Sequence, residues 1–217
     1  SFISINSGAG WSKIGSNPLP EYQTLNSIST YDGTNIWAAG SSGKILKSTD
    51  GGANWADATT SSITSTINGI EFVSDLTGYA VVSSAIYVTN NGGTSWASQT
   101  LPSPAVSQIQ EVAFATTTRG YLCTALGAIR ITSNGYTWTA PTTTPPPGKW
   151  YGIATPDESV AYICGGSGTD SKIIKTVNGG SSWSTLSATF ANTTFNSISF
   201  PTTSTGWAVG SGGAVYK

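Results

Sequence analysis

The chain has 217 residues but no histidine, no methionine and only two cysteines. Without histidine, the usual general base, the serine–histidine triad and every histidine-based metal site are excluded. Two separated cysteines, Cys123 and Cys164, cannot form a zinc site alone. We therefore expect no metal, no cofactor and few ways to build a catalytic centre.

Charge is equally scarce, at 9% of residues with a net charge of −1. No basic surface is available to neutralise phosphates, which argues against nucleic acid as a partner. The longest apolar runs are far shorter than the roughly 20 residues that cross a bilayer, so we expect no membrane insertion. A surface of serine, threonine, asparagine and glycine is typical of secreted, periplasmic or cell-surface proteins, and Asn192 begins the one clean glycosylation sequon.

What the sequence does contain is a repeat. Five tryptophans recur every 41 to 45 residues, and each closes a turn with the frame Ser/Thr-x-Asp/Asn-x-Gly-x-x-Trp. The Asp or Asn accepts backbone hydrogen bonds, the Gly supplies a positive φ and the Trp packs over the loop, which predicts a scaffold and not calcium or sugar ligation. The defining pairs are Asn6 and Trp11, Asp50 and Trp55, Asn91 and Trp96, Ser133 and Trp138 (a weaker copy), and Asn178 and Trp183.

Each unit also repeats short segments that are rich in β-branched and aromatic residues and separated by Gly, Asn and Ser, which favours strands over helices. Four strands in about 43 residues are the signature of a propeller blade. The first segments begin at Leu25, Ile67, Ile109, Trp150 and Phe195, and the second are led by Trp37, Tyr79, Tyr121, Tyr162 and Trp207.

We therefore predict one all-β domain, a five-bladed β-propeller of four-stranded blades. The predicted blades are 17–62, 63–104, 105–143, 144–190 and 191–217 plus 1–16. One further period of 45 residues leads from Trp183 across the chain ends to Trp11. We expect the N-terminal strand to complete the last blade and close the ring, because open edges promote aggregation. In the alternative, the end strand pairs with a neighbouring molecule and the chain polymerises.

Two segments carry a family resemblance. The stretch Phe195-Asn-Ser-Ile-Ser-Phe-Pro, followed by Thr205-Gly-Trp-Ala-Val-Gly-Ser-Gly-Gly-Ala-Val-Tyr-Lys, and the turn Ser48-Thr-Asp-Gly-Gly-Ala-Asn-Trp55 resemble the Asp-box (BNR) propellers. The similarity is greatest to the branch that includes the photosystem II assembly factors Ycf48 and HCF136. The resemblance implies the fold but not one function, because this repeat serves sialidases, xyloglucanases, sorting receptors and assembly factors alike.

The residues argue against several of these activities. Sialidases hold their substrate carboxylate with three arginines, and this chain has only Arg119 and Arg130. With two arginines, this chain also cannot form the arginine-rich patch that the assembly factors carry on seven-bladed rings. Propeller glycosidases need two carboxylates about 5 to 10 Å apart, and Glu71 and Glu111 lie in first strands near the axis at positions that do not align between blades. We expect no enzyme activity.

Binding loops are the remaining candidates, and two loops break the repeat. They are 141–150, which contains three consecutive prolines, and 165–172; both are expected on the same face of one blade. Their residues could offer a stacking surface and hydrogen-bond donors to a glycan or an extended peptide. In the bland alternative, which we favour for Trp150, that side chain simply starts a strand in the core. The candidate ligand-binding residues are Lys149, Trp150, Tyr151, Asp170 and Lys172.

A second candidate is a set of polar residues at one aligned position, directly after the first apolar residue of each blade. If this position faces the channel, the set forms an axial polar ring that could hold waters or a small ligand; hydrogen bonding between strands is an equally good explanation. The ring residues are Asn26, Asn68, Gln110, Tyr151 and Asn196.

Cys123 and Cys164 occupy equivalent positions in separate blades, where other units have Ala39, Val81 and Val209. We expect both to be buried as small hydrophobes and not bridged. Together, these features predict a non-enzymatic, secreted or surface-exposed module that binds a glycan or a protein. The alternative is a self-assembling structural subunit of an extracellular layer or fibre, and a glycoside hydrolase comes third.

Overall fold

The structure is a computed structural model that describes residues 2–3, 12–13, 23–101, 106–166, 171–186, 190 and 193–217. It is all-β apart from two short 3-10 turns, η1 (Ser41–Gly43) and η3 (Ser211–Gly213). In the described part of the chain, no helix is long and apolar enough to cross a membrane. The predicted all-β class is confirmed.

The strands form successive antiparallel sheets in which each strand pairs with the next one along the chain. The first sheet is β3 (Leu25–Thr30), β4 (Ile36–Gly40), β5 (Ile45–Ser48) and β6 (Ala56–Asp57). The second is β7 (Ile67–Phe72), β8 (Gly78–Val82), β9 (Ala85–Thr89) and β10 (Ala97–Gln99). The third is β11 (Ile109–Phe114), β12 (Gly120–Thr124), β13 (Ile129–Thr132) and β14 (Trp138–Thr139). The fourth is β15 (Trp150–Ala154), β16 (Ala161–Gly165), β17 (Lys172–Thr176) and β18 (Ser184–Thr185). The fifth is β19 (Phe195–Ser199), β20 (Trp207–Gly210) and β21 (Val215–Tyr216), and a separate pair joins β1 (Phe2–Ile3) to β2 (Ser12–Lys13).

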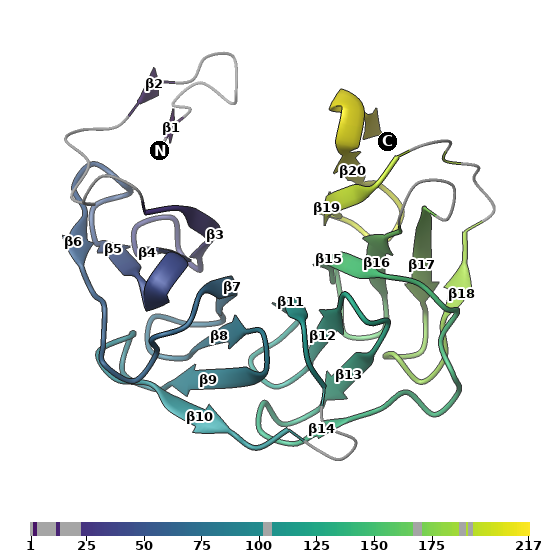
Figure 1. The fold of residues 1–217 in the computed structure, drawn as a ribbon, viewed down its shortest axis with the longest axis horizontal. Helices are drawn as coiled ribbons and strands as arrows, with labels where there is room; N and C mark the ends of the chain where they lie inside the picture. The colour runs from purple at the N-terminus through teal and green to yellow at the C-terminus, as the bar shows by residue number, and fades with distance from the viewer. Residues whose placement is uncertain are drawn as a thin grey trace.

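These sheets are the five blades of a propeller. Figure 1 shows them following one another around a centre, with the first strand of each blade innermost. The innermost strands of successive blades contact one another, from β3 to β7, β11, β15 and β19. Any side chain that the first strands turn inward therefore meets its counterparts from the other blades.

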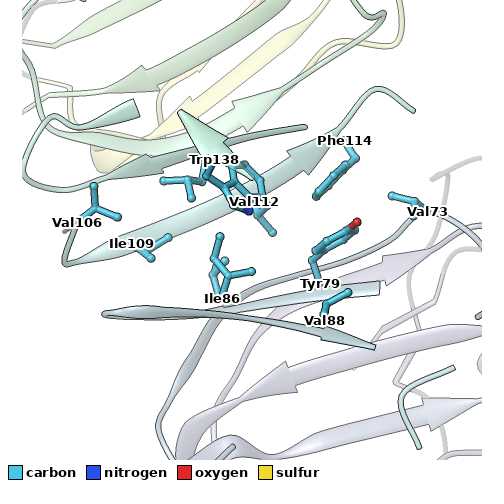
Figure 2. Packing of buried hydrophobic residues seen from close by; sticks show 11 residues of the cluster. Val73, Tyr79, Ile86, Val88, Val106, Ile109, Val112, Phe114 and Trp138 are labelled. Carbon is cyan, nitrogen blue, oxygen red and sulfur yellow. The ribbon is translucent and has the colours of Figure 1, made fainter. Parts of the chain in front are cut away.

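The core lies between the blades in four apolar clusters. In three of the four junctions the aromatic residue of a second strand stacks on a phenylalanine of the next blade. The ring centroids are 3.5 Å apart for Trp37 and Phe72, 4.1 Å for Tyr79 and Phe114, and 3.6 Å for Tyr162 and Phe200. Figure 2 shows the second of these pairs within its cluster. The repeated aromatic residues are thus interblade contacts.

The repeated turns hold the third and fourth strands of each blade together. In the first blade, Asp50 Oδ1 accepts hydrogen bonds from the Ser48 hydroxyl and the Asn54 backbone N–H, both at 2.8 Å. The Trp55 indole N–H donates to the Gly52 carbonyl at 2.9 Å, and Gly52 has a φ of 91° that favours glycine. The hydrogen bonds that Asp50 accepts from Asn54 and Ser48, led by that from the Asn54 backbone, lower the pKa of Asp50. Asn91 and Asn178 make the same bonds in their blades, whereas Asn6 and Trp11 lie outside the described residues.

The prediction for Ser133 is wrong, because the acceptor of this turn is its neighbour. Asn134 Oδ1 accepts from the backbone N–H groups of Tyr136 and Thr137, at 2.9 and 2.8 Å, while Ser133 is exposed. The copy is one residue shorter than the others between its threonine and its tryptophan. Asn134 follows Thr132 by two residues, as Asp50 follows Ser48, so the missing residue lies between the amide and the tryptophan. This turn still has an amide oxygen that accepts backbone hydrogen bonds, but the spacing between the amide and the tryptophan is shorter.

This turn offers a matched pair of substitutions. Asn134→Ala removes an acceptor from two backbone N–H groups and should lower the free energy of unfolding by about 1 kcal/mol. Ser133→Ala, one residue away and exposed, should change it by less than about 0.5 kcal/mol. Chemical denaturation of both variants tests this assignment, and the reverse order of effects would restore the original frame.

Ring closure by the N-terminal strand stays a prediction. Among the described residues β21 pairs with β20, and β1 pairs with β2. The two terminal blades also expose apolar residues at positions that are buried elsewhere: Ile28 is 62% exposed while its counterpart Ile70 is 1% exposed, and Trp207 is 41% exposed while Trp37 is fully buried. The exposed face of each terminal blade therefore carries the same kinds of apolar residue that pack between blades elsewhere.

The two cysteines behave as expected. Cys123 and Cys164 are free and buried, and they belong to different interblade clusters. Burial raises the pKa of both thiols, so they remain protonated and inert at neutral pH. The prediction of two unbridged, hydrophobic cysteines is confirmed.

Candidate functional site

The five predicted axial residues share one backbone feature. In every blade the pairing of the first and second strands skips one residue, which leaves a β-bulge directly after the first apolar residue. A bulge turns a side chain out of its regular alternation, and bulges often lie next to binding sites. The skipped residues are Asn26, Asn68, Gln110, Tyr151 and Asn196.

The structure brings all five residues together. They line a single cavity of about 350 Å³, which we call the axial cavity, and Glu111 is the sixth lining residue. The repeat therefore places the five aligned polar residues around one space, and their role as an axial polar ring stays a prediction. Whether the cavity binds a ligand is a separate question, because the amides also serve the scaffold.

Three of the amides have a fixed orientation. Asn26 Nδ2 donates to the Ile67 carbonyl at 2.9 Å, and Asn68 Nδ2 donates to the Ile109 carbonyl at 2.6 Å, each on the next blade. Gln110 Nε2 donates to the Gln108 carbonyl at 3.1 Å. A carbonyl only accepts, so each amide nitrogen must face the backbone. The expected hydrogen bonding between strands is thus present, and it leaves the amide oxygens to face elsewhere.

Glu111 brings a carboxyl group into this polar ring. Its side chain lies against β7, where a Cβ on Gly69 would come within 2.6 Å of Glu111 Oε1, so the absence of a side chain at Gly69 makes room for it. Burial and, second, the negative charge of Glu71 raise the pKa of Glu111 to about 8, although a hydrogen bond from the Val112 backbone acts weakly in the opposite direction. The carboxyl group is therefore mostly protonated at neutral pH.

Glu71 lines a different cavity, of about 470 Å³, together with Thr30, Tyr31 and Phe114 among others. Burial raises the pKa of Glu71 to about 7. Glu71 and Glu111 are near enough for the charge of one to affect the other, yet among the described cavities none is lined by both. The arrangement differs from that of a glycosidase, whose two carboxylates face each other across one cleft.

The two irregular loops of the fourth blade do meet. Lys172 Nζ donates to the Pro147 carbonyl at 3.1 Å, and the Gly166 backbone N–H donates to the Lys149 carbonyl at 2.8 Å. Both loops leave from the end of the blade where Trp150 pairs with Gly165, which is also the end that carries the bulge at Tyr151. We call this end of the fourth blade the loop face.

Trp150, one residue of the predicted patch, cannot provide a stacking surface for a ligand. Trp150 is fully buried in the cluster between the third and fourth blades, and its indole N–H donates to the Gly127 carbonyl at 3.2 Å. Its ring packs under Gly148, where a Cβ would clash with the indole at 2.6 Å. Lys149 is exposed, Tyr151 and Lys172 are half-buried, and Asp170 lies outside the described residues.

Glu111 is the functional candidate that the alignment of polar residues missed. The position after each bulge holds Ser27, Gly69, Gly152 and Ser197 in the other blades, all of them small. A single glutamate in a column of serine and glycine was the available signal. No group of three or more Asp, Glu, His or Cys side chains in the described part of the chain is placed to hold a metal ion.

Comparisons with known proteins agree with this architecture. The family described as "Photosynthesis system II assembly factor YCF48" matches residues 6–88. The solved structure "YCF48 bound to D1 peptide" superposes with a TM-score of 0.71 at 19% identity, covering 93% of this chain and 66% of that one. The structure "YCF48 from Cyanidioschyzon merolae" gives 0.72 at 16% identity, covering 99% and 74%. An ancestral GH74 enzyme gives 0.69 at 17% identity, covering 96% and 31%. No curated protein sequence matches the chain.

Identities below 20% establish the fold and leave function open. The chain spans 66% of the peptide-bound Ycf48 structure and about a third of the GH74 enzyme, so the partners and activity of those proteins do not transfer with the superposition. The repeated turns, the blade topology and the match over residues 6–88 converge on one conclusion. The chain has the fold of a BNR-repeat β-propeller, and it is similar to the Ycf48 family over residues 6–88.

Proposed function

We propose that this propeller is a non-enzymatic binding module that holds an extended segment of a partner protein on the loop face of its fourth blade. The observation that carries the proposal is the junction of the two irregular loops, which Lys172 joins to Pro147. Three consecutive prolines stiffen one loop, so little conformational entropy is lost when a ligand docks. Exposed Lys149 and half-buried Tyr151 offer a charge and a partly apolar ring to that ligand.

The solved Ycf48 structure with a D1 peptide supports a peptide ligand over a glycan, since it shows that a propeller of this type holds one. The photosystem role itself is not proposed for this chain. Its two arginines cannot form an arginine-rich patch, and Arg130 is buried. The neutral, hydroxyl-rich composition supports a secreted or cell-surface location as part of the same proposal.

The lack of enzyme activity belongs to the proposal as well. The half-buried carboxyl groups Glu71 and Glu111 line separate cavities, and burial raises their pKa values to about 7 and about 8. Neither arrangement supplies an ionised carboxylate opposite a protonated one across a single scissile bond. This supports binding over hydrolysis, although GH74 enzymes share the fold.

The test is a screen of the purified protein against a phage-displayed library of linear peptides and against a glycan array. We expect selected peptides to bind saturably, and Lys149→Ala combined with Tyr151→Ala to weaken them at least about tenfold. Tyr136→Ala is the matched control, because Tyr136 is exposed in the turn between the third and fourth strands of its blade, away from the loop face. Binding of glycans alone, or equal losses in control and double variant, would overturn the proposal.

A second function has an observation of its own in its favour. Ile28 on the first blade and Trp207, Val209 and Val215 on the last are exposed apolar residues on faces that resemble interblade contacts. If these faces pack on other copies, the chain is a structural subunit that assembles head to tail. Light scattering on the screened sample distinguishes the two functions: large assemblies that dissociate in Trp207→Ser favour the subunit, and a monomer favours the binding module.

A further inference from the structure

We propose that the axial cavity binds a single organic ammonium group, from a small primary amine or from a lysine side chain. The inference does not depend on the partner that the loop face holds. It rests on the chemistry of the cavity wall, on the burial of one carboxyl group in that wall and on the size of the space.

The wall presents acceptors. Because Asn26, Asn68 and Gln110 donate their amide N–H groups to backbone carbonyls, their oxygens are the polar atoms left for a ligand. No donor to these oxygens is found among the described residues. An ammonium group carries three donors and no acceptor, which is the complement of such a wall. Tyr151 adds the edge or face of an aromatic ring to the same wall.

Glu111 supplies the charge. Its side chain is half-buried, its carboxyl group lies beside Gly69, and it lines the cavity. Within the described part of the chain no lysine or arginine lines that cavity. The titratable groups around it are Glu71 from β7, Cys123 from β12, Cys164 from β16 and Tyr151 from β15. None of these is a cation, so a bound ammonium would be the first positive charge beside the carboxyl group.

An organic ammonium fits this cavity better than a metal ion does. Calcium takes six to eight oxygen ligands at about 2.3 to 2.6 Å and usually needs several carboxylates. One carboxyl group lines the axial cavity, and the 350 Å³ of space is far larger than a bare ion. A primary amine with a short alkyl chain fills more of that space and keeps its donors directed at the wall.

Binding should be coupled to a proton. The pKa of Glu111 is about 8 in the empty cavity, so an ammonium that pairs with the carboxylate must first displace a proton at pH 7. The ionised fraction of a group with a pKa of about 8 rises about tenfold between pH 7 and pH 9. The apparent affinity for an amine, which itself stays mostly protonated at pH 9, should rise by about the same factor.

The experiment is calorimetric titration of the purified chain with n-butylammonium chloride at pH 7 and pH 9, with 1-butanol as the uncharged analogue and calcium chloride as the metal probe. We expect saturable amine binding that is about tenfold tighter at pH 9, release of nearly one proton at pH 7 and no binding of 1-butanol. Binding of calcium without binding of the amine would overturn the proposal, as would no saturable amine binding at pH 9.

Two conservative variants locate the site. Glu111→Gln keeps the shape of the side chain and should abolish both amine binding and its proton release. Glu71→Gln makes the same change in the other cavity; it should retain binding and move its pH dependence to lower pH, because one negative charge near Glu111 is gone. Circular dichroism confirms that both variants are folded. Amine binding that is unchanged in Glu111→Gln would place the ligand elsewhere and end the proposal.

Discussion

Glu111→Gln is expected to stabilise the protein at pH 9 by on the order of 3 kcal/mol while leaving its stability at pH 5 nearly unchanged. In the wild type, the folded chain must ionise a half-buried carboxyl group at high pH, with Glu71 nearby and, among the described residues, no lysine or arginine lining the same cavity. Glutamine has the same shape and never ionises. The substitution removes an unfavourable charge without opening a cavity.

The sign follows from proton binding. Folding raises the pKa of Glu111 from 4.5 to about 8 and that of Glu71 to about 7. Between pH 4.5 and pH 8 the folded chain therefore holds more protons than the unfolded chain, so the free energy of unfolding falls as the pH rises. The stabilisation associated with the protonated carboxyl groups is complete below about pH 4.5 and is lost as the pH passes through about 8.

Urea denaturation at pH 5, 7 and 9 measures this dependence. The wild type should lose stability across the series, and Glu111→Gln should lose less. Thermal unfolding at pH 9 should give the variant a melting temperature about 10 °C above that of the wild type. Exposed Glu158 provides the control, since Glu158→Gln should follow the wild type at every pH. If Glu111→Gln raised the free energy of unfolding equally at pH 5 and pH 9, the stabilisation would not come from the ionisation of this carboxyl group.

The fold was predictable because its determinants are local and repeated. A turn such as Ser48 to Trp55 makes its hydrogen bonds within eight residues, so the sequence frame is nearly a description of the structure. Repetition then places equivalent residues at equivalent depths, which is why Asn26, Asn68 and Gln110 could be assigned to one axial ring before the bulges that direct them were visible.

The site was less predictable because it depends on contacts between blades. Trp150 stands beside the proline-rich loop in the sequence, but its ring packs into the third blade, and only the burial of that junction decides its role. Glu111 acquires its raised pKa from burial and from the charge of Glu71, and Glu71 and the Gly69 that makes room for the side chain both lie on the neighbouring blade. The turn at Asn134 shows a different limit of prediction from sequence. It is one residue shorter than the other turns, so counting back from Trp138 selected Ser133, whereas the hydrogen-bond acceptor is Asn134.

The interblade stacking gives the second large effect. Phe114→Ala should lower the free energy of unfolding by about 4 kcal/mol, because it removes a buried ring from the cluster in Figure 2. Phe114 stacks on Tyr79 with centroids 4.1 Å apart, and it meets Trp138 edge to face at 5.9 Å. Gly120 lies so close to the ring that a Cβ there would clash at 2.5 Å, which leaves little room for the site to collapse after truncation.

Phe200 is the matched comparison, since it holds the same position in the last blade and stacks on Tyr162 at 3.6 Å but is only half-buried. Phe200→Ala should therefore cost about half as much as Phe114→Ala in the same chemical denaturation experiment. The comparison also tests how the last blade ends. Equal losses would mean that Phe200 is as deeply covered in solution as Phe114, which requires a further strand over the last blade and would support closure of the ring by the N-terminal segment. A smaller loss for Phe200→Ala would indicate that no further strand covers the last blade in solution, in agreement with the exposure of Trp207.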